Sequence, residues 1–157
     1  YNRGNALKQL ERYEEALNSY DRAIEFSPKN LLAWYYRGVN LIEWGCHEKA
    51  ILSFDRALTI QPQYYKAWLH KGFAWEQLKN YENAIASYNQ ALELAPSDDA
   101  VWYNRGRCYM VLKNIDRAVE NFRQAISIHP RKYLQIIQTD AQFDSLRHDE
   151  RFQALLK

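Results

Sequence analysis

Cysteine, proline and glycine are scarce in this sequence, whose 157 residues include two cysteines, four prolines and five glycines. Two cysteines cannot supply the disulfide framework of a small secreted domain, so we expect a reducing compartment and a cytoplasmic location. The chain also lacks an apolar run of about 18 residues and has a mean hydropathy of −0.62. We therefore expect no membrane-spanning helix and no membrane partner.

Neither sign of charge is in large excess, since 21 lysines and arginines stand against 19 acidic residues. A dedicated nucleic-acid binder usually shows a basic stripe, so this balance argues against a nucleic-acid partner. Aromatic residues make up 15% of the chain, which argues against disorder. The sequence opens with Tyr1-Asn2-Arg3-Gly4 and has no initiator methionine or signal segment, so we expect a piece of a longer protein.

The residues that punctuate helices recur with a period of 34 residues, and only Gly45 stands outside the two series. The glycines and prolines of these series are Gly4, Gly38, Gly72, Gly106, Pro28, Pro62, Pro96 and Pro130. The same period aligns two alanine columns, one aromatic column and one tryptophan column: Ala16, Ala50, Ala84, Ala118; Ala23, Ala57, Ala91, Ala125; Tyr20, Phe54, Tyr88, Phe122; Trp34, Trp68, Trp102. Repetition at this period predicts a stacked array of supersecondary units.

Each unit is predicted to contain two helices, which we call helix A and helix B. In the second unit, apolar residues at helical spacing predict helix A over 31–44 and helix B over roughly 48–60. Gly45 can take the positive φ that ends a helix, and Pro62 stops the second helix. Small residues at the glycine and alanine columns let the two helix axes approach to about 8–10 Å.

The recurring Trp, Gly, Ala, Phe/Tyr, Ala and Pro columns resemble the tetratricopeptide repeat (TPR) family. The resemblance implies an all-α fold, a right-handed α-solenoid of antiparallel helix pairs, over residues 1–130. We expect a truncated first repeat at 1–30 and further repeats at 31–64, 65–98 and 99–132. Residues 131–157 are predicted to form a C-terminal cap, in which Asp149 begins a last helix and Phe152, Leu155 and Leu156 fold back on the array.

No pattern of catalytic or metal-binding residues is present, so we expect no enzyme activity, no metal and no cofactor. Cys46 beside His47 has no second cysteine–histidine pair, which favours a simple turn. Cys108 occupies a column of small residues in helix A, which favours a buried structural role over a nucleophile.

The TPR resemblance implies that ligands contact the concave wall, which is built mainly from helix A. The positions implied around each glycine include an aromatic and amide-rich set suited to an extended peptide. These candidate peptide-binding residues are Asn5, Tyr35, Tyr36, Val39, Leu69, His70, Phe73, Tyr103, Asn104 and Arg107. An alternative for any single tyrosine is that it packs between neighbouring helices.

Two peptide-capture modes of the family are only partly represented. The carboxylate clamp of some TPR co-chaperones is matched at Asn5 and Lys66, two of five positions. The asparagine ladder that holds a peptide backbone is matched at Asn2 and Asn104 only. The sequence therefore predicts neither mode, although recognition of a peptide backbone stays open.

A basic residue precedes each repeat glycine, in the column Arg3, Arg37, Lys71 and Arg105. These residues either form a continuous basic surface for an acidic partner, or pair with helix B acids such as Asp21 and Asp55 or with the C-termini of helices. The small net charge favours the second interpretation.

Two classes of function remain. The first is a protein-interaction module that binds a peptide or partner domain in the concave groove. The second is a structural or regulatory segment of a larger protein, which could self-associate through an apolar N-terminal edge lined by Leu7, Leu10, Tyr13 and Leu17.

Overall fold

The computed structural model describes residues 1–157 as helices joined by short connections, with no strand. The chain divides into two compact units, Tyr1–Leu94 and Ala95–Lys157. The predicted all-α class is confirmed. The boundary between the units falls near the end of the predicted third repeat, so the assignment of 1–130 to one array and the right-handed superhelix stay predictions.

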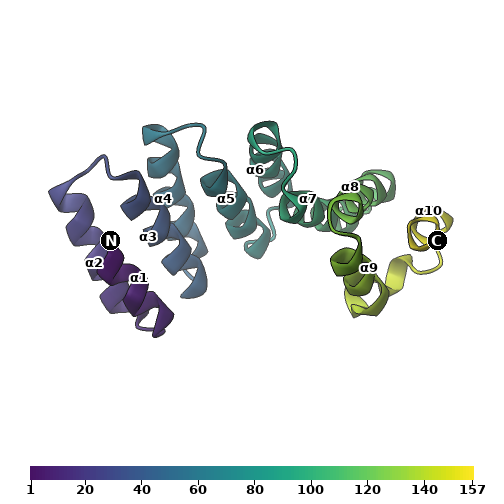
Figure 1. The fold of residues 1–157 in the computed structure, drawn as a ribbon, viewed down its shortest axis with the longest axis horizontal. Coiled ribbons are helices and arrows are strands. Elements are labelled where there is room, and N and C mark those ends of the chain that lie inside the picture. Colours follow the sequence, from purple (N-terminus) through teal and green to yellow (C-terminus); the bar gives the residue numbers. More distant parts are fainter. The chain divides into compact units, whose positions relative to one another are not determined.

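The first unit consists of three consecutive helix pairs (Figure 1). Their bounds are α1 Asn2–Gln9, α2 Tyr13–Phe26, α3 Leu31–Glu43, α4 His47–Ile60, α5 Tyr65–Gln77 and α6 Tyr81–Leu94. Each helix packs on the next, and α1 also contacts α3, as α3 contacts α5. Helices A (α1, α3 and α5) are therefore neighbours in space, which places their predicted site residues on adjacent helices.

The second unit contains one more helix pair and the predicted cap. Its elements are α7 Asp99–Val111, α8 Ile115–Ile128, α9 Pro130–Thr139, the 3-10 helix η1 Ala141–Leu146, α10 Glu150–Gln153 and the 3-10 helix η2 Ala154–Leu156. The Asp149 side chain accepts the backbone N–H of Arg151, as expected of a helix cap. Phe152 is completely buried, Leu155 and Leu156 are half-buried, and α10 and η2 both contact α8. That residues 131–157 act as a cap stays a prediction.

The repeat columns form the core. The alanines of both columns are completely buried except Ala23, which is half-buried. The aromatic column is completely buried in all four pairs, and each repeat glycine faces the aromatic ring of its own helix B. The period of the sequence is therefore the period of helix–helix contact.

Candidate functional site

Tyr35 and Tyr36 are neighbours on α3 but differ in exposure. Tyr35 is only 6% exposed, and its ring lies edge-on to the rings of Tyr36, Tyr64 and His70 at centroid distances of 5.1–5.5 Å. Burial raises the pKa of the Tyr35 phenol well above its ordinary value. This burial agrees with the alternative that the tyrosine packs between neighbouring helices, and a ligand contact by Tyr35 stays a prediction.

Tyr36 is half-exposed and connects the first two helix pairs. Its ring stacks on Tyr1, with centroids 5.8 Å apart and planes 10° from parallel. The same side chain packs against the core of the first pair, which includes Leu7, and against that of the second, which includes Leu41. Tyr36 therefore presents a ring whose position is fixed by packing.

His70 lies on α5, next to Tyr35. Its Nδ1 is 2.8 Å from the carbonyl oxygen of Lys66, an acceptor, so Nδ1 must carry a proton. Burial lowers the pKa of His70 below its ordinary value, although the hydrogen bond to Lys66 opposes this shift. The neutral ring therefore has an unprotonated Nε2, which can accept a hydrogen bond.

The remaining predicted residues of the first unit have mixed surroundings. Val39, Leu69 and Phe73 are half-buried on α3 and α5. The Asn5 side-chain oxygen accepts a 2.6 Å hydrogen bond from the Tyr20 hydroxyl, so Asn5 helps to hold the core.

An ion pair joins the ends of two neighbouring helices A in the first unit. Lys8 Nζ on α1 lies 2.9 Å from Glu43 Oε1 on α3. Lys8 and Glu43 therefore neutralise each other at this position.

In the second unit, Tyr103 is held by the cap. Its hydroxyl accepts a 3.0 Å hydrogen bond from Gln142 Nε2, and its ring lies 5.1 Å from that of Tyr133. The Arg107 guanidinium is 5.9 Å from the Tyr103 ring centroid, within cation–π range. Asn104 is half-buried on the same helix. The cap thus positions the aromatic residue of α7.

Three of the four residues of the basic column, Arg37, Lys71 and Arg105, bond to side chains of helices B. Arg37 pairs with Asp21 at 2.7 Å, and Lys71 pairs with Asp55 at 2.7 Å, both with the acid of the preceding helix B. The interpretation that favoured helix B acids is confirmed for these two residues. Arg105 instead donates to the side-chain oxygen of Asn121 at 2.8 Å.

Most residues of the predicted apolar N-terminal edge are buried or half-buried. Leu7 is 7% exposed and lies in the core between α1 and α2, while Leu17 packs against the core of the next pair. Tyr13 is half-buried, and only Leu10, at 66%, is widely exposed. The edge is therefore much smaller than the sequence indicated.

The two cysteines are free. Cys46 lies in the turn, as predicted, at the N-cap position of α4 and without a side-chain capping bond, and Cys108 is completely buried. The structure contains no group of three or more His, Cys, Asp or Glu side chains arranged to hold a metal ion. None of its helices has the length and apolar character that a bilayer-crossing segment requires.

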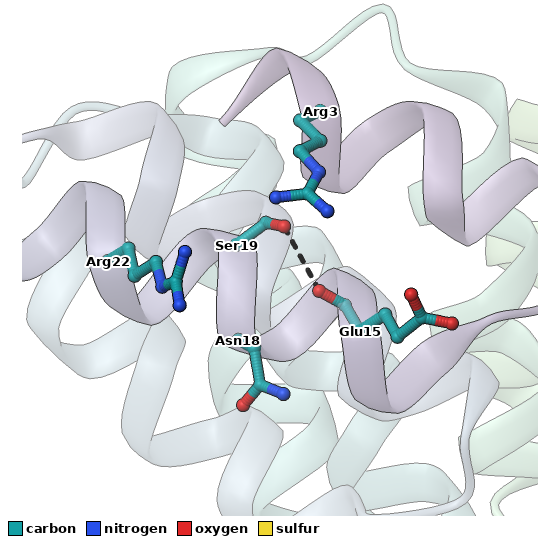
Figure 2. Close-up of a pocket in the computed structure, with 5 residues that line it drawn as sticks. All are labelled: Arg3, Glu15, Asn18, Ser19 and Arg22. Atoms are coloured by element: carbon teal, nitrogen blue, oxygen red, sulfur yellow. Dashed lines mark hydrogen bonds between the residues drawn. The ribbon is translucent and has the colours of Figure 1, made fainter.

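Three pockets that sequence reasoning missed lie beside helices B. The first, of about 170 Å³, is lined by Arg3 of α1 and by Glu15, Asn18, Ser19 and Arg22 of α2 (Figure 2). Two others, of about 470 and 450 Å³, share Trp34, Arg56 and Thr59. The pockets beside Trp34 are formed by residues from several segments, so the 34-residue pattern at one position does not predict them.

Comparison with known proteins identifies the repeats. A family model described as TPR repeat matches residues 4–41, and one described as tetratricopeptide repeat matches residues 65–98 and 100–132. Together they cover more than half of the chain. A comparison with curated proteins gave no match.

Solved structures share the fold at low sequence identity. The crystal structure of MamA is 19% identical, with 98% of this chain and 90% of that chain covered and a TM-score of 0.84. MamA from Desulfovibrio magneticus RS-1, from residue 41 to its end, is 22% identical, with 98% and 91% covered and a TM-score of 0.80. YrrB, described as a TPR protein with an unusual peptide-binding site, is 20% identical, with 98% and 79% covered and a TM-score of 0.77. With the repeat matches and the helix pairs, these likenesses lead to one conclusion: the chain belongs to the tetratricopeptide repeat family.

Proposed function

We propose that this chain is a non-catalytic, cytoplasmic interaction module that binds a peptide or partner domain through helices A. The observation that carries the proposal is the group of half-exposed side chains Tyr36, His70 and Phe73 on the neighbouring helices α3 and α5. Aromatic rings bury a partner's side chains, and the Nε2 of neutral His70 accepts a hydrogen bond from a backbone N–H. Val39 and Leu69 add apolar area.

The second unit contributes its own contacts through α7. Tyr103, Asn104 and Arg107 combine a ring, an amide and a guanidinium on one helix, and the cap holds the ring in place. Aromatic and arginine side chains dominate the binding energy of most protein interfaces. That the fold also occurs in YrrB, described as having a peptide-binding site, supports a peptide as the partner.

The proposal is tested by selecting random dodecapeptides displayed on phage against the whole chain and mapping the selected peptides by NMR. We expect the perturbed amide signals to lie around Tyr36, His70 and Phe73, or around Tyr103. Replacing Tyr36 by alanine should weaken binding by about 1–2 kcal/mol. The matched control is Phe26→Ala, since Phe26 is 94% exposed on α2 and its ring supports no core.

Two results would overturn this proposal. Equal affinity of the Tyr36→Ala, Tyr103→Ala and unchanged proteins would show that helices A are not the binding surface. Failure to select any peptide, together with concentration-dependent sedimentation that Leu10→Ser abolishes, would favour the alternative of a self-associating scaffold.

A further inference from the structure

One tryptophan of the repeat column stands in a surface pocket of unusual chemistry. The pocket, of about 470 Å³, is formed by three segments: the α2–α3 connection, helix α3 and the end of helix α4. Its lining residues are Pro28, Lys29, Trp34, Arg56, Thr59 and Ile60. They include two cations and no acid, with an aromatic ring and an isoleucine beside them. This volume is in the range of pockets that take a ligand or an anchoring side chain.

The tryptophan ring is already fixed before any partner arrives. Its indole Nε1 donates a 2.9 Å hydrogen bond to the carbonyl oxygen of Pro28, and the Arg37 guanidinium lies 5.9 Å from the ring centroid. A ring held in this way loses little conformational entropy on binding, which favours its use as an anchor.

The two cations of the pocket have no ionic partner within the chain. Neither Lys29 nor Arg56 takes part in an ion pair or a side-chain hydrogen bond, whereas Arg37 and Lys71 pair with helix B acids. The adjoining pocket contains one acid, Asp55, and Lys71 neutralises it at 2.7 Å. The unpaired charge around Trp34 is therefore positive.

The positive charge of Lys29 and Arg56 occurs only beside Trp34 among the three tryptophans of the column, and the fold does not require it. Lys29 and Arg56 correspond to Gln63 and Gln90 beside Trp68, one period later. The next period has Ser97 and Gln124 beside Trp102. All three tryptophans make the same hydrogen bond to a proline carbonyl, at 2.8–2.9 Å. The hydrogen bond that fixes each tryptophan therefore does not depend on cations such as Lys29 and Arg56.

From these observations we propose that the Trp34 pocket is a second docking site, separate from the group formed by Tyr36, His70 and Phe73. Its occupant is an acidic segment of a partner protein that carries an apolar side chain between carboxylates. The apolar side chain lies against Trp34 and Ile60, and the flanking carboxylates pair with Lys29 and Arg56. The exposed Leu52, which lines the adjoining pocket and is 65% exposed, extends the apolar contact.

The probe is a capped pentapeptide with a central leucine and two glutamates on each side, titrated into the whole chain. The readout is the indole N–H signal of Trp34 in NMR spectra, assigned through Trp34→Phe. We expect a saturable shift that weakens as salt is raised, because exposed charge pairs are screened. Peptides with glutamine for every glutamate, or with alanine for the leucine, should bind at least about threefold more weakly, since each lacks one of the two contacts.

Matched variants separate the pocket from general positive charge. Lys29→Gln with Arg56→Gln reproduces the residues beside Trp68 and should weaken binding about fivefold, the effect of losing two surface ion pairs. Arg22→Gln removes the corresponding cation of α2 and should leave the affinity unchanged. The transplant Gln63→Lys, Gln90→Arg and Glu93→Thr should make the Trp68 indole respond to the same peptide.

Several results would overturn the proposal. The first is a Trp34 indole signal that does not move at the highest soluble concentration of the glutamate peptide. The others are equal affinity of the double variant and the unchanged protein, and equal affinity of the glutamine and glutamate peptides. A shift of the same size with inorganic phosphate alone would reduce the pocket to an anion site. Stronger binding of a single-stranded oligothymidylate would assign it to nucleic acid instead. The experiment does not involve Tyr36 or Tyr103, so its outcome is independent of the helix A proposal.

Discussion

Gly38 lies directly against the ring of Phe54, and a Cβ atom at Gly38 would be 2.6 Å from Phe54 Cε1. The same relationship joins the glycine and the aromatic residue of the other three pairs, with closest distances of 2.6–2.8 Å. No real Cβ approaches a carbon so closely, so alanine there requires the ring or the helix to move. This contact explains why the period of the sequence is strict at these two columns.

Gly38→Ala should destabilise the first unit by about 1–3 kcal/mol, the usual cost of overpacking. The loss should occur although alanine is the better helix former by about 1 kcal/mol. Chemical unfolding followed by circular dichroism measures it. In a Phe54→Leu background the smaller side chain leaves room, so the same substitution should cost less. Equal costs in both backgrounds would show that the ring does not limit the approach of the helices.

Glycine should stabilise the turn between helices A and B at the repeats where a lysine occupies the left-handed position. Gly45 has φ +81°, and the corresponding Lys79 and Lys113 have φ 58° and 60°. A left-handed residue other than glycine is strained, so Lys79→Gly should stabilise the chain by about 0.5–1 kcal/mol after the entropy cost of glycine.

The reverse change supplies the control for this turn. Gly45→Ala should destabilise by a similar amount, although nothing lies within 4 Å of the added Cβ. Thermal unfolding of both variants gives the comparison. If Lys79→Gly lowers the melting temperature, contacts of the lysine outweigh the backbone strain.

Acid should weaken the second unit through Asp99. Burial tends to raise the pKa of Asp99, but hydrogen bonds from Tyr133 and Lys132 prevail and lower it from 3.8 to about 2. A carboxyl group whose pKa is lowered by folding stabilises the folded state fully above about pH 4, and this contribution is lost as the pH falls toward 2.

Asp99→Asn should therefore flatten the dependence of thermal stability on pH between 4 and 2. Tyr133→Phe removes a 2.6 Å hydrogen bond to the same carboxylate and should move the pKa of Asp99 back toward 3.8 in a carbon-13 NMR titration. An unchanged pKa in this variant would assign the shift to Lys132 and His129 alone.

The cap should be a main source of stability for the second unit. Phe143 is completely buried, with its ring centroid 5.3 Å from that of Phe122 and 5.8 Å from that of Phe152. Phe143→Ala should cost about 3–5 kcal/mol. The exposed Gln138→Ala serves as the control in thermal unfolding. An unaltered melting temperature of Phe143→Ala would mean that residues 131–157 do not close the unit.

The sequence by itself determined the helix pairs and their order. Glycine, alanine, aromatic residues and proline at a fixed period each meet a local requirement of close helix packing or helix termination, so their columns predict the elements. The observed helices α3 and α4 differ from the predicted bounds by one residue. The small residue at Cys108 and the cap at Asp149 followed from the same reasoning.

Only the tertiary structure decided which of these residues are accessible. Tyr35 and Tyr36 are adjacent and chemically identical, yet Tyr35 is buried against Tyr64 at the N-cap of α5 and His70 within α5, while Tyr36 is half-exposed. The positive φ of Lys79 is likewise hidden, because the packed helices on either side impose the turn without a glycine. The Trp34 pocket requires three separate segments to meet. Burial and pocket shape depend on side chains that approach from other helices, and the repeat pattern of one chain does not specify those distances.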